Sequence, residues 1–191
     1  MNLERMILAA PALRLETERL VLRRLTVDDL PTAIAHEQDR RIMRWIRDPQ
    51  PVDEIRTRCE QTLATWHGDD GRWLLLAVQR RGDPAMLGIV CCRVTAAEHE
   101  TFEIGYRLHA DVHRRGYGLE ACRVLVDWLF GPIGARKLVA YCVAENEPSW
   151  RLMEKLGMQR EAVLREYSLL DGAWRDEFVY GLLRREWPGS G

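Results

Sequence analysis

The segment that most constrains the fold is a strand, a glycine-rich loop and a helix in direct succession. TFEIGYRL at 101–108 has the pattern of a strand, and LEACRVLVDWLF at 119–130 carries apolar residues at helical spacing. Between them lies ADVHRRGYG at 110–118, whose glycines Gly116 and Gly118 allow positive φ and close approach of the backbone. Such a junction turns several N–H groups and the positive end of the helix dipole toward one point. The segment predicts an anion site, with an ordinary tight turn as the alternative.

Several classes of protein are disfavoured by what the sequence lacks. The loop has no G-K-[ST] ending of a nucleotide P-loop, and no G-x-G-x-x-G dinucleotide fingerprint occurs. Because 28 Lys and Arg face 29 Asp and Glu, the net charge of −1 gives no bias toward nucleic acid or anionic membranes. The longest strongly apolar run, WLLLAV at 73–78, is far shorter than the roughly 20 residues of a spanning helix. Kinases, P-loop NTPases, nicotinamide-dependent Rossmann enzymes and integral membrane proteins therefore lose support.

The remaining pattern predicts one compact domain over 1–191, with residues 1–13 as a short arm. No convincing signal peptide is present, so we expect a cytoplasmic protein. Five cysteines without a C-x-x-C pair indicate reduced core thiols rather than a disulfide framework or a zinc site. The predicted order is β-α-α-β-β-β-α-β-α-β-β, an α+β or three-layer α/β fold. Strands are expected at 19–25, 73–79, 86–94, 101–108, 137–143 and twice within 159–183 around an Asp171-Gly172 turn, and helices from about 26 to 38 and at 52–66, 119–130 and 146–157.

A second motif follows the strand at 137–143. NEPSWRLMEKLG places Asn146 at the end of that strand and Ser149 in the first turn of the next helix. Together with TERLVLRRLTVDDL, FEIGYRL and HRRGYG, this motif resembles the GNAT superfamily of acyl-CoA-dependent N-acyltransferases over nearly the whole chain. TERLVLR, EIGYRL, N-x-x-S and the closing LREYSLLDGAWRDEFVYGLL are similar to the branch that acetylates the N-termini of ribosomal proteins. The resemblance implies a mixed, mostly antiparallel seven-stranded sheet with helices on both faces.

The resemblance also implies how acetyl-CoA is held. Leu108 and His109, at the end of a strand, would pair with the pantetheine arm where the sheet splays, and Asn146 would hydrogen-bond that arm or its waters. Many relatives place a tyrosine general acid where this chain has Met153, so that role falls to another group or to water. The loop would cradle the pyrophosphate through His113, Arg114, Arg115, Gly116, Tyr117 and Gly118.

Aminolysis of a thioester needs a neutral amine, a polarised carbonyl and a proton for the departing thiolate. Ser149 is the candidate donor to sulfur, against the alternative of an ordinary serine in a helix's first turn. Glu103 is the first candidate to take the proton of the amine and Glu166 the second, and the alternative for Glu103 is an exposed strand carboxylate. Some relatives carry a carboxylate further along the later strand, where this chain has Ser168. A backbone amide near the end of the strand at 101–108 is expected to polarise the carbonyl.

Aromatic residues are candidates for the wall of the acceptor site, although aromatics in strands and at helix ends more often belong to the core. The five histidines lack the spacing of metal ligands, so no metal is predicted. The candidate wall residues are Trp45, Tyr106, Tyr167 and Trp174, with Trp66 as a further one.

The sequence thus predicts direct transfer of an acetyl group from acetyl-CoA to a primary amine in a ternary complex. The branch resemblance implies the α-amine of a ribosomal protein N-terminus as the acceptor. Two alternatives stay open: an enzyme that acetylates small-molecule or antibiotic amines, and a non-catalytic module that binds CoA or a protein. No membrane or nucleic-acid partner is expected, and a homodimer is left open.

Overall fold

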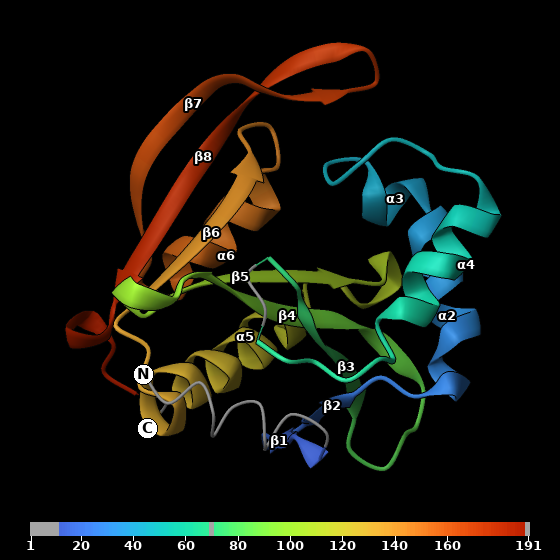
Figure 1. Cartoon of the computed structure of the whole chain (residues 1–191), viewed down its shortest axis with the longest axis horizontal. Coiled ribbons are helices and arrows are strands. Elements are labelled where there is room, and N and C mark those ends of the chain that lie inside the picture. Colours follow the sequence, from blue (N-terminus) through green and yellow to red (C-terminus); the bar gives the residue numbers. More distant parts are fainter. Residues whose placement is uncertain (1–11, 69–70, 190–191) are drawn as a thin grey trace.

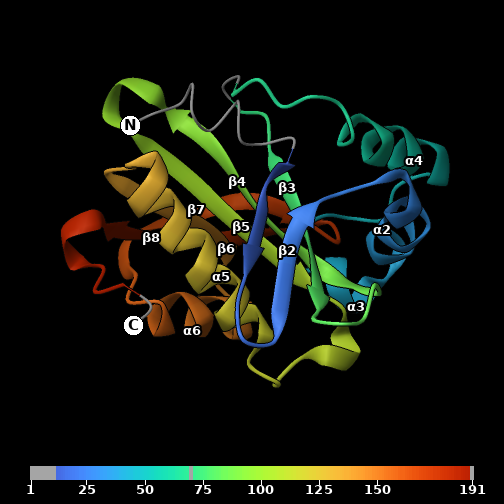
Figure 2. The ribbon, with the colours of Figure 1, turned by 90° about the horizontal axis from the view of Figure 1, so that it is seen from below.

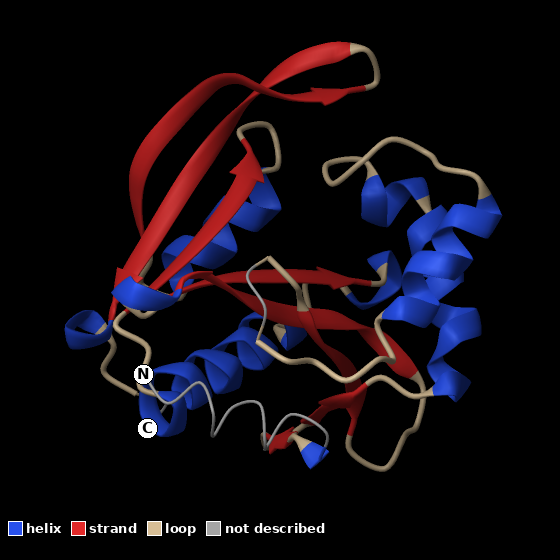
Figure 3. Ribbon diagram, in the orientation of Figure 1, coloured by secondary structure: helices blue, strands red, loops and turns tan. Residues whose placement is uncertain are grey.

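The computed structural model describes residues 12–68 and 71–189. In this part of the chain eight strands form one sheet in the order β1-β2-β3-β4-β5-β6-β8-β7 (Figures 1 and 3). Every neighbouring pair is antiparallel except β5 and β6, which run parallel. The strands are β1 (Arg14–Glu16), β2 (Leu20–Arg24), β3 (Leu74–Arg80), β4 (Met86–Ala96), β5 (Thr101–Leu108), β6 (Lys137–Val143), β7 (Gln159–Leu170) and β8 (Ala173–Leu183).

Helices cover both faces of this sheet, as the sequence predicted. α5 and α6 lie side by side against one face, and α2 and α4 pack together near the other end (Figure 2). Alternation along β4 separates the two layers, because Val90 and Cys92 pack toward α5 whereas Ile89 packs toward α2 and α4. The helices are α2 (Leu30–Gln38), α3 (Arg40–Met43), α4 (Val52–Gln61), α5 (Tyr117–Trp128) and α6 (Glu147–Lys155).

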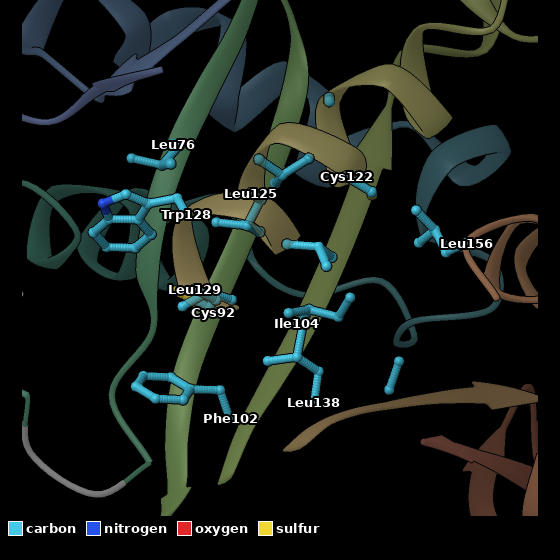
Figure 4. Packing of buried hydrophobic residues seen from close by; sticks show 14 of the residues in the cluster. Leu76, Cys92, Phe102, Ile104, Cys122, Leu125, Trp128, Leu129, Leu138 and Leu156 are labelled. Atoms are coloured by element: carbon cyan, nitrogen blue, oxygen red, sulfur yellow. The ribbon is translucent and has the colours of Figure 1, made fainter. Parts of the chain in front are cut away.

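The larger core lies between α5 and the middle strands. Cys122, Leu125 and Leu129 follow one stripe of α5 and its continuation, and they face Phe102 and Ile104 of β5 (Figure 4). The helical spacing of apolar residues in the sequence therefore predicts this contact. α5 is fixed over β5, and its first turn lies beside the end of that strand.

β5 and β6 are neighbours over a short distance only. Their parallel pairing covers Thr101, Phe102 and Glu103 opposite residues 137–139. Beyond Glu103 each strand continues without pairing to the other, β5 to Leu108 and β6 to Val143. The two strands therefore splay, and the backbone edges of β5 and β6 that face each other beyond Glu103 are open.

β7 and β8 form a long hairpin that rises from the sheet away from α5 (Figure 1). The register shifts between Leu164 and Ser168, and within this bulge Glu166 has a left-handed φ of 51°. At the hairpin turn, the carboxylate of Asp171 accepts from Arg40 at 2.7 Å, and its backbone N–H donates to Asp48 at 2.8 Å. The hairpin is thereby tied to α3 and the loop after it.

Most element boundaries match the predictions, with three differences. The short helix α3 was not predicted. The sheet has an eighth strand, because residues 14–16 pair with β2 at the edge. α4 ends at Gln61 rather than near Trp66, whose indole is buried and donates to the carbonyl of Arg72 at 3.0 Å. Most of the predicted arm, residues 1–11, lies outside the described residues, and Leu13 belongs to the core.

The five cysteines are free thiols, as predicted. Four of them are buried and Cys91 is half-buried. Burial raises the pKa of Cys91 to about 12 and that of Cys142 to about 11. No helix among the described residues is long and apolar enough to cross a membrane.

Gly88 provides a test of how tightly β4 and β5 are packed at the end where the site forms. A Cβ at this position would lie 2.6 Å from Cα of Leu108 and against the carbonyl oxygen of Arg107. We expect Gly88→Ala to lower the free energy of unfolding by about 1–3 kcal/mol, because the backbone must shift. Urea denaturation measures this loss. Gly131→Ala is the matched control, since nothing lies within 4 Å of its added Cβ, and an equal loss there would contradict the explanation.

Candidate active site

The glycine-rich loop ends as a cap on α5. After a 3-10 turn over Ala110–Val112, Arg114 and Gly116 adopt left-handed conformations with φ of 60° and 81°. Within the described residues, the backbone N–H groups of residues 114–118 have no hydrogen-bond acceptor. Arg114 and the side chain of its neighbour Arg115 are exposed beside them. Because the first N–H groups of a helix lack intrahelical partners, this loop is a ready anion site.

Three residues, two in the turn between β1 and β2 and one in α5, support the loop and are called the brace. Arg19, in the turn between β1 and β2, donates to the carbonyl of Arg115 at 3.1 Å and pairs with Glu120 at 2.5 Å. Its guanidinium also lies 4.9 Å from the ring centre of Tyr117. Thr17 hydrogen-bonds the same carboxylate. The brace, formed by Thr17, Arg19 and Glu120, therefore fixes both the loop and the first turn of α5.

Gly118 lets α5 approach its neighbours closely. A Cβ at this position would lie 3.0 Å from Cδ1 of Leu152 on α6 and 3.2 Å from Cδ1 of Leu108 on β5. Both distances are shorter than ordinary van der Waals contact. The glycine therefore keeps the start of α5 next to the open ends of β5 and α6.

On the side of the sheet that carries α6, Ser149 meets Tyr106. The Tyr106 hydroxyl lies 2.8 Å from the carbonyl oxygen of Ser149 and 3.0 Å from its Oγ. A carbonyl can only accept, so the Tyr106 proton points to it and the Ser149 hydroxyl is free to donate to the tyrosine oxygen. Burial raises the pKa of Tyr106 well above its usual range. The Tyr106 hydroxyl is therefore protonated near neutral pH.

Asn146 caps α6 from the end of β6 with its backbone alone. Its carbonyl accepts from the N–H of Ser149 at 3.0 Å. Its carboxamide has no hydrogen-bond partner among the described residues. Met153, one turn further along α6, is 1% exposed and belongs to the core. α6 thus offers an amide and a hydroxyl at its first turn, and the Met153 position adds no polar group.

The opposite face of β5 carries Glu103. Arg93 on β4 contacts one oxygen of this carboxylate, with Nε at 2.7 Å and a terminal nitrogen at 2.5 Å. Burial raises the pKa of Glu103 above its usual range, Arg93 opposes that rise, and the charge of Glu177 adds to it. Glu103 is therefore a buried carboxylate already committed to an arginine.

Glu177 on β8 is the functional candidate that the sequence analysis missed. It lies opposite Val143 of β6 and on the same face of the sheet as Glu103, by the alternation of side chains. Ser168, where the sequence analysis found no carboxylate, donates its hydroxyl proton to Oε1 of Glu177. Counting from the Asp171-Gly172 turn could have indicated which face of the sheet carries Glu177. The contact between Ser168 and Glu177 could not be predicted, because the bulge in β7 shifts the register of the hairpin.

These features decide the family once known proteins are compared. The acetyltransferase (GNAT) domain model matches residues 19–159. The chain belongs to the GNAT acetyltransferase family. It is an acetyl-CoA-dependent N-acetyltransferase of that family, with a mixed, mostly antiparallel sheet. The fold and reaction class that the sequence resemblance implied are thereby confirmed.

Relatives of this enzyme agree on the family and differ in what their names say of the acceptor. The uncharacterised N-acetyltransferase YoaA of Bacillus subtilis is 28% identical over 89% of this chain and 96% of its own. A GNAT acetyltransferase structure from Bacillus anthracis is 25% identical with a TM-score of 0.79, covering 91% of this chain and all of that one. The uS5-alanine N-acetyltransferase of Escherichia coli is 26% identical over 45% of each chain.

The predicted wall aromatics do not gather in one place. Tyr106 faces α6 and Ser149, and Trp174 lies on the face of β8 opposite Arg175 and Glu177 and is 59% exposed. Trp45, in the turn after α3, is half-buried beneath Arg44, whose guanidinium is 4.4 Å from the ring centre. Tyr167 is exposed within the hairpin bulge beside Glu166.

His109 and His113 both make hydrogen bonds to the backbone at the loop. Nε2 of His113 lies 2.9 Å from the carbonyl oxygen of Leu108, and Nδ1 of His109 accepts from the N–H of Asp111. The ring of His36 lies 5.3 Å from that of His109. Burial lowers the pKa of His36 to about 4, and the nearby His109 and Arg107 lower it further. Among the described residues no group of three His, Cys, Asp or Glu could hold a metal.

The brace makes a prediction about cofactor affinity. Arg19→Leu removes the contacts to Arg115 and Glu120 but none of the loop's own N–H groups. We expect KM for acetyl-CoA to rise about fivefold, the effect of about 1 kcal/mol from one lost hydrogen bond, with kcat unchanged. Steady-state kinetics with varied acetyl-CoA measure both constants. Arg14→Leu is the control, since Arg14 pairs with exposed Glu16 and with no other carboxylate in the described part of the chain, and a fall in kcat alone would contradict the role of Arg19.

Proposed function

We propose that the enzyme transfers the acetyl group of acetyl-CoA directly to the α-amine of a protein N-terminus, with both substrates bound at once. The observation that carries this proposal is the splay beyond Glu103. It separates the hydroxyls of Tyr106 and Ser149 on one face from the carboxylates of Glu103 and Glu177 on the other. The amine can therefore give its proton to a carboxylate on one face, and the leaving sulfur can receive a proton from a hydroxyl on the other.

The residues present fit acetyl-CoA. The free N–H groups of residues 114–118 suit a pyrophosphate, and Arg114 and Arg115 add positive charge at the rim. The cofactor supplies an activated acetyl thioester. The carboxamide of Asn146, free of protein partners among the described residues, suits the amides of the pantetheine arm.

The open edge of β5 supplies the backbone groups that this arm and the carbonyl require. The N–H of His109 donates to Leu87 on β4 at 2.7 Å. Successive residues of a strand direct their backbone groups to opposite sides, so Leu108 and Tyr106 direct theirs away from β4 and toward the splay. The carbonyl of Leu108 is taken by His113, whereas the N–H groups of both residues stay available. We assign the polarisation of the thioester carbonyl to one of these N–H groups.

Direct transfer is favoured over a cysteine intermediate. Cys142 is the thiol beside Ser149, and burial raises its pKa to about 11, although the Ser149 hydrogen bond opposes the rise. Cys122, on α5 nearby, is fully buried and its pKa is raised further by the same cause. Because the thiolate is the nucleophile, neither residue is reactive near neutral pH.

The relatives support a protein N-terminus as the acceptor. Two that match part of this chain carry the names of ribosomal-protein N-acetyltransferases, from Bacillus subtilis and Escherichia coli, at 26% identity each. The acceptor face, defined as the face of β5, β6 and β8 that carries Glu103 and Glu177, is flanked by the hairpin and the loop after α3. An extended peptide suits this position, since its amine can reach the splay while its chain leads away along the hairpin.

A thermal-shift and peptide assay tests the proposed function. We expect acetyl-CoA at about 100 times its Kd to stabilise the fold by about 2.7 kcal/mol, with no comparable effect of ATP or NAD. Gly116→Trp fills the loop and abolishes the shift. Mass spectrometry should then show a gain of one acetyl group on the α-amine of ribosomal-protein N-terminal peptides.

The outcomes separate the alternatives. An absence of any shift with acetyl-CoA contradicts the cofactor assignment. A shift with acetylation of small amines and not of peptides contradicts the acceptor and favours a small-molecule acetyltransferase. A shift without acetylation of any amine favours a CoA-binding module.

Ser149 is the proposed proton donor to the departing thiolate. The Tyr106 hydroxyl holds Ser149 in position through a hydrogen bond to its carbonyl. General acid catalysis contributes about 10²- to 10⁴-fold. Because water can replace part of this contribution, we expect Ser149→Ala to lower kcat by about 10- to 100-fold. Kd for acetyl-CoA should stay within about twofold, and Ser149→Thr should restore most of the rate. Stopped-flow detection of the released thiol measures the step. An unchanged kcat in Ser149→Ala assigns the proton to water instead.

A further inference from the structure

The acceptor face carries two carboxylates, and the amine's proton must go to one of them. Glu103 is 8% exposed, and Arg93 contacts its Oε2 twice. Burial raises the pKa of Glu103 and Arg93 opposes that rise, but a buried carboxylate whose oxygen is fixed by an arginine is poorly accessible to an incoming amine. Glu103 is therefore suited to balancing charge near the splay rather than to accepting the proton.

Glu177 differs from Glu103 in its partners. It is half-buried, and its Oε1 accepts the hydroxyl proton of Ser168. Its Oε2 has no hydrogen-bond or ion-pair partner among the described residues. A serine hydroxyl orients a carboxylate without neutralising it. Glu177 thus presents one oriented and unoccupied oxygen.

Along the sheet, Glu177 lies where β5 and β6 have already separated. It pairs with Val143, the last residue of β6, which lies four residues beyond Val139, the partner of Glu103. Three residues past Val143 the chain reaches Asn146, and Ser149 follows in the same turn of α6. Glu177 and Ser149 therefore flank the open end of β6 from opposite faces.

We propose that Glu177 is the general base that takes the proton from the acceptor's ammonium group, with Ser168 as its positioning residue. This inference rests on the proposed function and names the base of that same site. The Oε2 of Glu177 accepts one proton from R–NH3⁺, which leaves R–NH2 with a free electron pair. That nitrogen forms the bond to the acetyl carbon as the carbon–sulfur bond breaks and the electron pair leaves on sulfur.

The protons balance over the whole reaction. The nitrogen loses its second proton to water as the amide forms, and the thiolate gains a proton from Ser149, which takes one back from water. Glu177 returns its proton to water, so one proton is released for each acetyl group transferred. No oxidant, reductant or further reactant is needed.

Other charged groups surround Glu177 and leave its Oε2 open. Arg175 on the same strand pairs with Glu145 at 3.0 Å, and Arg93 pairs with Glu103. Tyr141 on β6 lies on the same face, and burial raises its pKa. Glu177 is the carboxylate on this face that no cation pairs with among the described residues.

The test compares glutamine variants of the three candidate bases in the full-length enzyme, with the peptide amine as acceptor. Glu177→Gln should lower kcat/KM by about 10²- to 10³-fold, the range of general base catalysis, and remove the fall in kcat/KM toward low pH. Glu103→Gln and Glu166→Gln should each lose less than about tenfold and keep that fall. Glu161→Gln is the matched control, since Glu161 lies on the same hairpin and pairs with Lys137 far from the splay.

Ser168 provides a second readout. Ser168→Ala should lower kcat while leaving KM for acetyl-CoA unchanged, and Ser168→Thr, which keeps the hydroxyl, should restore kcat. Acetyl-CoA binding measured by calorimetry confirms that each variant is folded. A large loss in Glu103→Gln or Glu166→Gln together with a small one in Glu177→Gln overturns the proposal.

A third measurement does not depend on finding the acceptor. Carbon-detected NMR of the glutamate carboxyl groups follows the titration of Glu103 in the wild type and in Glu177→Gln. Because the charge of Glu177 raises the pKa of Glu103, the variant should show Glu103 titrating at a lower pH. An unchanged titration shows that the two carboxylates do not share one site and overturns the assignment. If acetyl-CoA binds and this shift occurs but no peptide is acetylated, the acceptor proposal fails. The assignment of Glu103 and Glu177 to one site then still holds.

Discussion

β5 and β6 pair over three residues and then part, and the whole site depends on this break in the sheet. Pairing up to Glu103 holds the two strands in one register, so the residues beyond it sit at matched levels on either side of the splay. The break leaves the N–H groups of Tyr106 and Leu108 without a strand partner. Helices α5 and α6 begin at the ends of the same two strands, which brings their N-terminal turns to the opening.

Backbone groups and side chains contribute different interactions at this opening. The loop before α5 offers N–H groups, and the brace of Thr17, Arg19 and Glu120 keeps them in place from the edge of the sheet. In the proposed mechanism side chains supply the proton chemistry, with hydroxyls on the α6 face and carboxylates on the acceptor face. The sheet itself keeps these two sets on opposite faces.

The conformation of the glycine-rich loop and the position of its helix could be predicted because both depend on neighbours in sequence. Gly116 and Gly118 allow the backbone of the loop, and the apolar stripe of α5 fixes which side packs on β5. Ser149 and Asn146 were likewise found in the first turn of α6. The acceptor face could not be predicted in the same way, because the bulge in β7 changes which residues of β7 and β8 lie opposite each other.

The sequence by itself determined the fold class, the glycine-rich loop, the family and the order of the helices and strands other than β1 and α3, since each is written in local spacing and in motifs. Tertiary structure alone decided the partners of the chemical groups. It placed Tyr106 against Ser149, Arg93 on Glu103 and Ser168 on Glu177. These contacts join residues 9 to 43 positions apart. Strand register and the splay set such distances, and a change of one residue in register would turn each side chain to the other face of the sheet.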